Sequence, residues 1–101
     1  MNNEAIKKIA DTYGYDAQSR QLIEEMSELT QAINKAWRKR YDDFEERTKA
    51  FKNIREEICD VEIMLSQIKY LLEISDTEIN EIIEQKLNRQ LERIEKNEWI
   101  E

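Results

Sequence analysis

The chain contains one glycine and no proline in 101 residues. Folds rich in β-structure need such residues at their turns, so this scarcity excludes most of them. Apolar residues recur at spacings of three and four along most of the sequence, which is the period of an amphipathic helix. The sequence therefore predicts an all-α protein with a single domain over residues 1–101, built as a bundle of about four helices.

Local capping patterns predict where these helices begin and end. Gly14 is expected to take a left-handed conformation that ends the first helix, and Ser75 with Glu78 forms a capping box. We expect the chain after Glu95 to fray. The predicted helices cover about residues 3–12, from Asp16 or Ser19 to about Arg40, from a cap at Asp42 or Asp43 to about Leu72, and from Ser75 to about Glu95.

The third predicted helix has a wide apolar face. Its stripe runs from Phe51 to Leu72, and Ile63, Met64 and Leu71 extend it beyond the width that one partner helix covers. A domain of this size buries only about 60–65% of its unfolded surface. We therefore expect part of the core to lie between subunits, with assembly into a dimer or tetramer; the alternative is a monomeric bundle.

The charge balance limits the possible partners. Sixteen Lys and Arg against 23 Asp and Glu give a net charge of -7, which argues against a nucleic-acid partner. No apolar run approaches the roughly 18–20 residues that cross a bilayer, and no signal peptide opens the chain, so no membrane partner is expected. Cys59 is the only cysteine, which favours a reducing, cytoplasmic location. Without histidine, catalytic triads and most zinc or iron sites lack their usual residue.

Two acidic pairs repeat at an offset of 32 residues: Glu25 with Glu28, and Glu57 with Asp60. At about 100° per residue, the members of each pair lie about 60° apart on one flank of an apolar stripe. In an antiparallel helical hairpin, the midpoint of the two pairs is residue 42.5, at the predicted turn. All four carboxylates should therefore lie at one level of the hairpin.

Four neighbouring carboxylates repel one another, so they need raised pKa values or a bound cation. Magnesium, or else manganese, is the simplest choice, because both prefer oxygen ligands. Zinc is disfavoured without histidine, and a di-iron site is disfavoured because no Glu-x-x-His motif is present. The alternative is that these acids form a solvated surface.

Glu24, Glu25 and Glu28 form an E-E-x-x-E motif, and Glu57 and Asp60 form E-x-x-D. This ordered pair resembles the motifs of MazG-like, all-α nucleoside triphosphate pyrophosphohydrolases, and the resemblance covers about residues 4–95. It implies metal ligands at the same four acids and magnesium as the cofactor. It also implies cleavage of nucleoside triphosphates between the α- and β-phosphates and assembly into dimers or tetramers. Cys59 stands where the family often has a small residue, and we interpret it as a buried core residue.

The resemblance also suggests residues around the acidic site. Glu24 would orient or deprotonate the attacking water or hold an additional metal ion, unless it is only a surface residue. Basic residues recur at i, i+3 and i+7 on the last helix and resemble the phosphate-binding positions of the family; ordinary salt bridges are the alternative. These residues are Lys86, Arg89 and Arg93. Apart from the resemblance, the side chains of Gln18, Gln21 and Trp37 are suited to hydrogen-bond or stack on a base; for Trp37 the alternative is a core or interface position.

An alternative function uses none of this chemistry. A small acidic bundle that binds a protein partner, or a nucleotide without turnover, would have the same high charge and wide apolar stripes. Only the repeated carboxylate motifs favour the enzyme.

Overall fold

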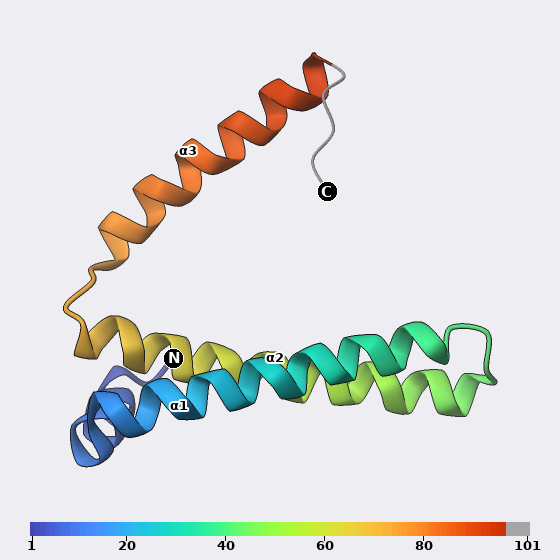
Figure 1. Ribbon diagram of the computed structural model, residues 1–101, viewed down its shortest axis with the longest axis horizontal. Coiled ribbons are helices and arrows are strands. Elements are labelled where there is room, and N and C mark those ends of the chain that lie inside the picture. The colour runs from blue at the N-terminus through green and yellow to red at the C-terminus, as the bar shows by residue number, and fades with distance from the viewer. Residues whose placement is uncertain (97–101) are drawn as a thin grey trace.

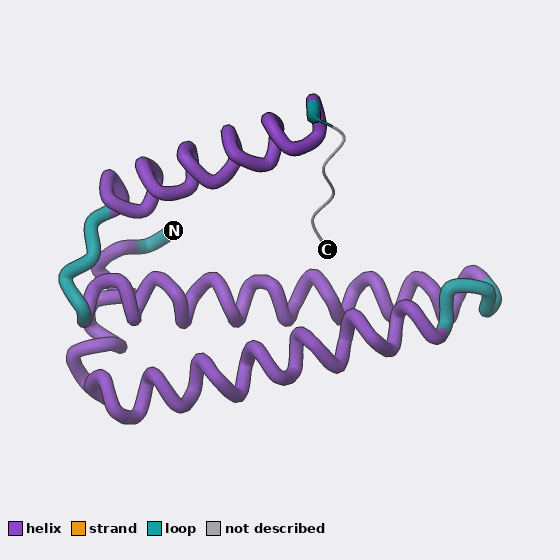
Figure 2. Tube along the Cα trace, turned by 45° about the horizontal axis from the view of Figure 1, so that its top comes forward, coloured by secondary structure: helices purple, strands orange, loops and turns teal. Residues whose placement is uncertain are grey.

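The computed structural model describes residues 1–96. They form three helices, α1 (Asn3–Arg38), α2 (Phe44–Leu71) and α3 (Asp76–Glu95) (Figure 1). This part of the chain contains no strand (Figure 2), which confirms the all-α class. Within the same residues, none of the helices has an apolar stretch long enough to cross a bilayer.

Helix α1 is bent at Gly14, where the sequence predicts a break. Gly14 has φ 82° and ψ 171°, while the residues on both sides are helical. This extended backbone with positive φ favours glycine, because a side chain there costs about 1–3 kcal/mol. Two helical segments therefore meet at Gly14, where the sequence predicts that one helix ends and the next begins. Only ψ differs from the prediction, because it is not that of a left-handed helix cap. Both segments belong to α1, so the three labelled helices cover the four helical segments that the sequence predicts.

Local caps begin the other helices as predicted. Asp43 caps α2 by accepting a hydrogen bond of 2.9 Å from the Glu46 amide. Ser75 and Glu78 form the expected reciprocal capping box at the start of α3. Of the residues after Glu95, where fraying is expected, Lys96 caps α3, and residues 97–101 lie outside the described part of the chain.

Helices α1 and α2 lie side by side as an antiparallel hairpin (Figures 1 and 2). Near one end, Gln18 Nε2 donates a 2.8 Å hydrogen bond to Gln67 Oε1, and both side chains are buried. Near the turn, Lys39 Nζ lies 2.7 Å from Glu46 Oε2. The midpoint of each pair is residue 42.5, so both contacts agree with the predicted register.

The buried core of one chain is thin. Only six apolar residues of the described part are buried, and three of them are alanine: Ile6, Ala10, Ala32, Ala50, Val61 and Met64. Much of the predicted stripe stays exposed, including Met26 at 41% and Leu65 at 42%. The interface between α1 and α2 is therefore narrower than the apolar faces of the two helices.

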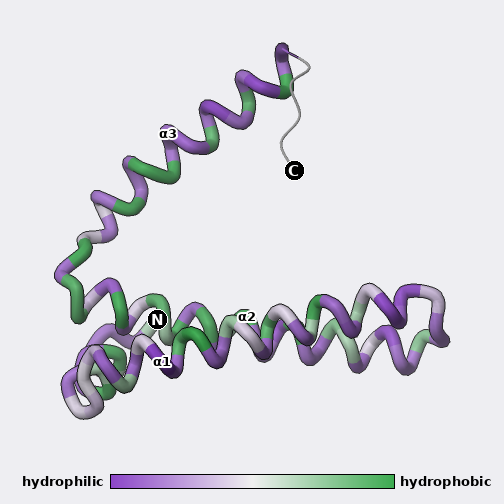
Figure 3. Tube along the Cα trace, in the orientation of Figure 1, coloured by the Kyte–Doolittle hydropathy of each residue, from purple (hydrophilic) through white to green (hydrophobic). Residues whose placement is uncertain are grey.

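Helix α3 packs against neither α1 nor α2 (Figure 1). Its apolar row therefore has no partner within residues 1–96, and Leu87 and Leu91 are 50% and 60% exposed. Hydrophobic positions recur along the length of α3 (Figure 3). The radius of gyration is 17.2 Å, against about 13 Å for a compact domain of this length. Residues 1–96 of a single chain therefore do not form a closed four-helix bundle.

Candidate metal centre

The hairpin register places the two acidic motifs at the same level. With a midpoint at residue 42.5, Glu28 lies opposite Glu57 and Glu25 lies opposite Asp60. Both motifs lie inside long, uninterrupted helical stretches of α1 and α2. Their backbones are therefore held rigidly by hydrogen bonds within each helix.

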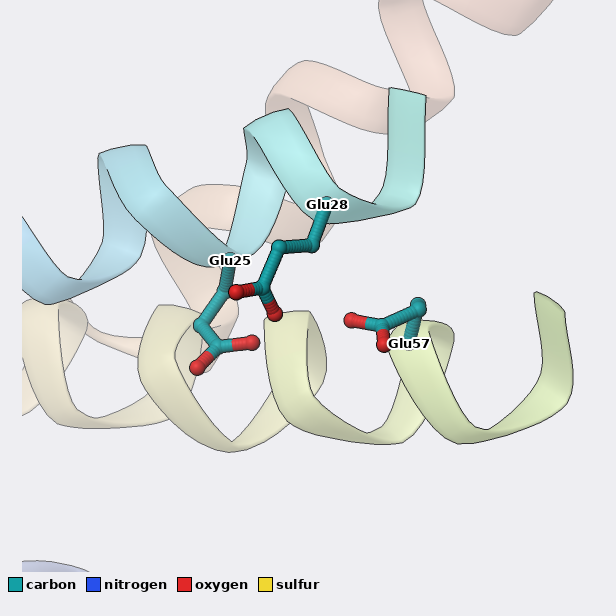
Figure 4. A group of neighbouring side chains, drawn as sticks. All are labelled: Glu25, Glu28 and Glu57. Atoms are coloured by element: carbon teal, nitrogen blue, oxygen red, sulfur yellow. The ribbon is translucent and has the colours of Figure 1, made fainter. Parts of the chain in front are cut away.

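Three of the four predicted ligands form a cluster. Glu25, Glu28 and Glu57 each supply one carboxylate oxygen, and these oxygens lie within 4.8 Å of one another. Figure 4 shows the side chains extending from both helices toward a common region, with the Glu28 carboxylate between the other two. Glu25 and Glu57 are half-buried, and Glu28 is exposed.

The cluster contains buried oxygens that lack a donor. Oε2 of Glu25 and Oε2 of Glu57 are inaccessible to solvent, and neither has a hydrogen-bond partner within the described residues. The other oxygen of Glu25 accepts a 2.9 Å hydrogen bond from Gln21 Nε2. Burial of a carboxylate oxygen without a donor or cation is unfavourable. This arrangement fits a bound cation with oxygen ligands.

Repulsion within the cluster changes the titration of Glu28. The pKa of Glu28 lies above its ordinary value of 4.5, chiefly because the negative charge of Glu25 lies beside it. Partial desolvation by neighbouring groups and the charge of Glu57 raise this pKa further. The folded protein therefore disfavours a third negative charge at this position.

The other two predicted acids lie outside the cluster. Asp60 is exposed and does not join the three glutamates, although it lies opposite Glu25 across the hairpin. Its side chain is one methylene shorter than that of glutamate. Glu24 is also exposed, about 100° around α1 from Glu25.

The predicted phosphate-binding residues are on α3. Lys86 and Arg89 are exposed, and Arg93 is half-buried. Because α3 packs against neither helix of the hairpin, the single chain does not bring them to the carboxylates.

The remaining predicted residues have identifiable contacts. The Gln18 amide is occupied by the buried contact with Gln67, and Gln21 binds Glu25. Trp37 is 66% exposed, and the Arg40 guanidinium lies 3.9 Å from its ring centroid.

Cys59 is exposed, so its interpretation as a buried core residue is wrong. That interpretation came from the family resemblance, whereas helical spacing places Cys59 about 160° around α2 from the buried Val61.

A cavity of about 390 Å³ adjoins the cluster on the side of the α1–α2 turn. Glu28 and Glu57 form part of its wall, together with Lys35, Arg38 and Asn53. Sequence reasoning missed these last three residues. The available sign was that Lys35 follows Glu28 by seven residues, which places both on one face of a helix.

Comparisons with protein-family models, with curated proteins and with solved structures give no match for this chain. The resemblance to MazG-like enzymes therefore rests on the two motifs.

The raised pKa of Glu28 leads to a prediction for the metal-free protein. The folded state binds the Glu28 proton more tightly than the unfolded state, so the free energy of unfolding should fall as pH rises from 4.5 through the raised pKa. Glu28→Gln cannot ionise at this position, so it avoids this loss of stability. Its free energy of unfolding should exceed that of wild type at pH 7 in EDTA. The advantage should shrink on acidification.

Urea unfolding in EDTA, from pH 4 to 8 at one protein concentration, measures these differences. Glu62→Gln is the matched control, because Glu62 is an exposed acid of α2 outside the cluster. Equal pH dependence in wild type and Glu28→Gln would contradict the proposed repulsion.

Proposed function

We propose that this protein is a magnesium-dependent nucleoside triphosphate pyrophosphohydrolase, which cleaves ribo- or deoxyribonucleoside triphosphates to the monophosphate and pyrophosphate. One observation carries the proposal: carboxylates from the two repeated motifs lie within 4.8 Å of one another across the hairpin. The ordered motifs and the buried oxygens without donors support it.

The donor set favours magnesium, with manganese as a substitute. Glu25, Glu28 and Glu57 offer only carboxylate oxygens, which hard cations prefer. The residues described here contribute no histidine or thiolate to the cluster, so zinc is disfavoured. Three acids also leave coordination positions open for a phosphate oxygen and water.

Each acid has a proposed role. Glu25, Glu28 and Glu57 hold the ion, and Asp60 is the fourth ligand, reached by a side-chain rotation from the position opposite Glu25. Glu24 orients or deprotonates the attacking water from the exposed side of α1.

The chemistry needs no histidine. When bound, magnesium neutralises charge on the phosphates and makes water a better nucleophile. The chain itself holds the carboxylates at fixed positions on two rigid helices, so that they need little rearrangement during the reaction. Such catalysis depends on positioning and electrostatics, which suits this acidic site.

Activity is tested by pyrophosphate release from a panel of NTPs and dNTPs with magnesium, manganese or EDTA. Wild type should release pyrophosphate from at least one nucleotide only when the metal is present. Glu57→Gln should reduce turnover by at least about 100-fold, because the charge that positions the ion is lost. The control Glu62→Gln should stay within about twofold of wild type. No metal-dependent release from any nucleotide, or full activity in Glu57→Gln, contradicts the proposal.

A second candidate is a non-catalytic interaction module. The exposed apolar row of α3 favours it, because an amphipathic helix without a partner is suited to bind another protein. Such a module requires neither pyrophosphate release nor a magnesium-dependent rise in melting temperature. Together, the activity panel and a thermal melt with magnesium distinguish the two functions.

Self-association is part of the enzyme proposal. The chain exposes 8413 Å², whereas a compact monomer of 12.2 kDa exposes about 6,000 Å². The excess is therefore about 2,400 Å² per chain, or about 4,800 Å² for two chains, within the range of obligate dimers. We propose that α3 packs on the hairpin of a second copy and brings Lys86, Arg89 and Arg93 toward the carboxylates of that copy.

Leu87→Asp on α3 tests this assembly, because each buried leucine contributes about 1.5–3 kcal/mol. Sedimentation velocity at micromolar concentration should show a dimer or tetramer for wild type and dissociation for Leu87→Asp. Gln85→Asp, on the polar face of the same helix, is the control and should stay associated. A monomeric wild type would rule out the assembly.

A further inference from the structure

The cavity beside the carboxylates is a groove with acidic and basic ends. It lies between α1 and α2, on the turn side of the cluster. Six lining residues belong to α1 and two to α2: Glu28, Gln31, Ala32, Asn34, Lys35, Arg38, Asn53 and Glu57. At about 1.5 Å per residue, Lys35 lies about 10 Å along α1 from Glu28, and Arg38 lies one turn further on.

The two cations are available to a ligand. Neither Lys35 nor Arg38 forms an ion pair with any acid of residues 1–96. The adjacent Lys39, in contrast, is paired with Glu46 at 2.7 Å. Asn53 lines the opposite wall and adds an amide that can donate a hydrogen bond.

The acidic end restricts which anions can enter. Glu28 and Glu57 line the same cavity, and they repel a free phosphate. The Glu57 oxygen without a donor needs a cation. An anion that carries a divalent cation satisfies both ends, because the metal meets the carboxylates and the phosphates meet Lys35 and Arg38.

We propose that this groove binds the polyphosphate portion of a metal–polyphosphate ligand, with Lys35, Arg38 and Asn53 contacting its phosphates. The substrate then lies along the hairpin, with its terminal phosphates toward the α1–α2 turn and its nucleoside toward Gln21. This orientation rests on the proposed function. The proposed binding in the groove does not depend on that function, because it requires only that a metal–pyrophosphate complex binds there.

Binding of inorganic pyrophosphate, measured by calorimetry with and without magnesium, tests the groove directly. The double variant Lys35→Gln/Arg38→Gln should weaken magnesium-dependent binding by at least about tenfold. Its rise in melting temperature with magnesium alone should match wild type, since the carboxylates are unchanged. Asn53→Asp, which adds a negative charge to the opposite wall, should also weaken pyrophosphate binding.

The matched control is Lys52→Gln/Arg55→Gln on α2. These two exposed cations have the same spacing of three residues, and their loss changes net charge equally, but neither lines the cavity. The control should change pyrophosphate affinity by less than about twofold. Equal weakening in both double variants, or equally tight pyrophosphate binding in EDTA, overturns the proposal.

The activity panel separates this inference from the proposed function. If wild type binds magnesium–pyrophosphate through Lys35 and Arg38 but hydrolyses no nucleotide, the binding proposal is supported and the proposed enzyme activity is wrong. If wild type hydrolyses nucleotides and both double variants keep its KM, the enzyme activity is supported and the proposed phosphate contacts of Lys35 and Arg38 are wrong.

Discussion

The antiparallel register of α1 and α2 is the constraint on which the candidate site depends. A shift of one residue in either helix turns its side chains by about 100°, which would move Glu57 away from Glu28. Apolar stripes alone tolerate shifts by a whole turn. The buried Gln18–Gln67 hydrogen bond does not, because a shifted register leaves two amides buried without partners. The Lys39–Glu46 contact supports the same register near the turn.

Two features of the single chain lack a partner of their own. The carboxylate cluster concentrates negative charge around buried oxygens without donors. Apolar residues of α3, such as Leu87 and Leu91, and of the hairpin, such as Met26 and Leu65, expose surface that a compact monomer would bury. A divalent cation would stabilise the first feature, and a second copy of the chain would stabilise the other. In the proposed enzyme, one assembly would meet both needs, because α3 of the second copy would add its cations to Lys35 and Arg38 beside the acidic cluster.

Local features were predictable from the sequence because they depend on neighbouring residues. The bend at Gly14, the Asp43 cap and the Ser75 capping box are of this kind. The acidic cluster was predictable because the repeat and the turn together set the register. The separation of α3 from the hairpin was not, since a helical stripe does not identify what it packs against. The burial of Gln18 and the grouping of Lys35 with Asn53 also depend on packing between helices that spacing alone does not give.

The metal centre is tested most directly by anomalous diffraction from crystals grown with manganese, an ion that substitutes for magnesium at carboxylate sites. The structure predicts a peak within coordination distance of oxygens from Glu25, Glu28 and Glu57. Side-chain rotation of Asp60 toward the same peak would identify it as the fourth ligand. A peak at other residues, or no peak between α1 and α2 when manganese is in excess, would contradict the proposed metal centre.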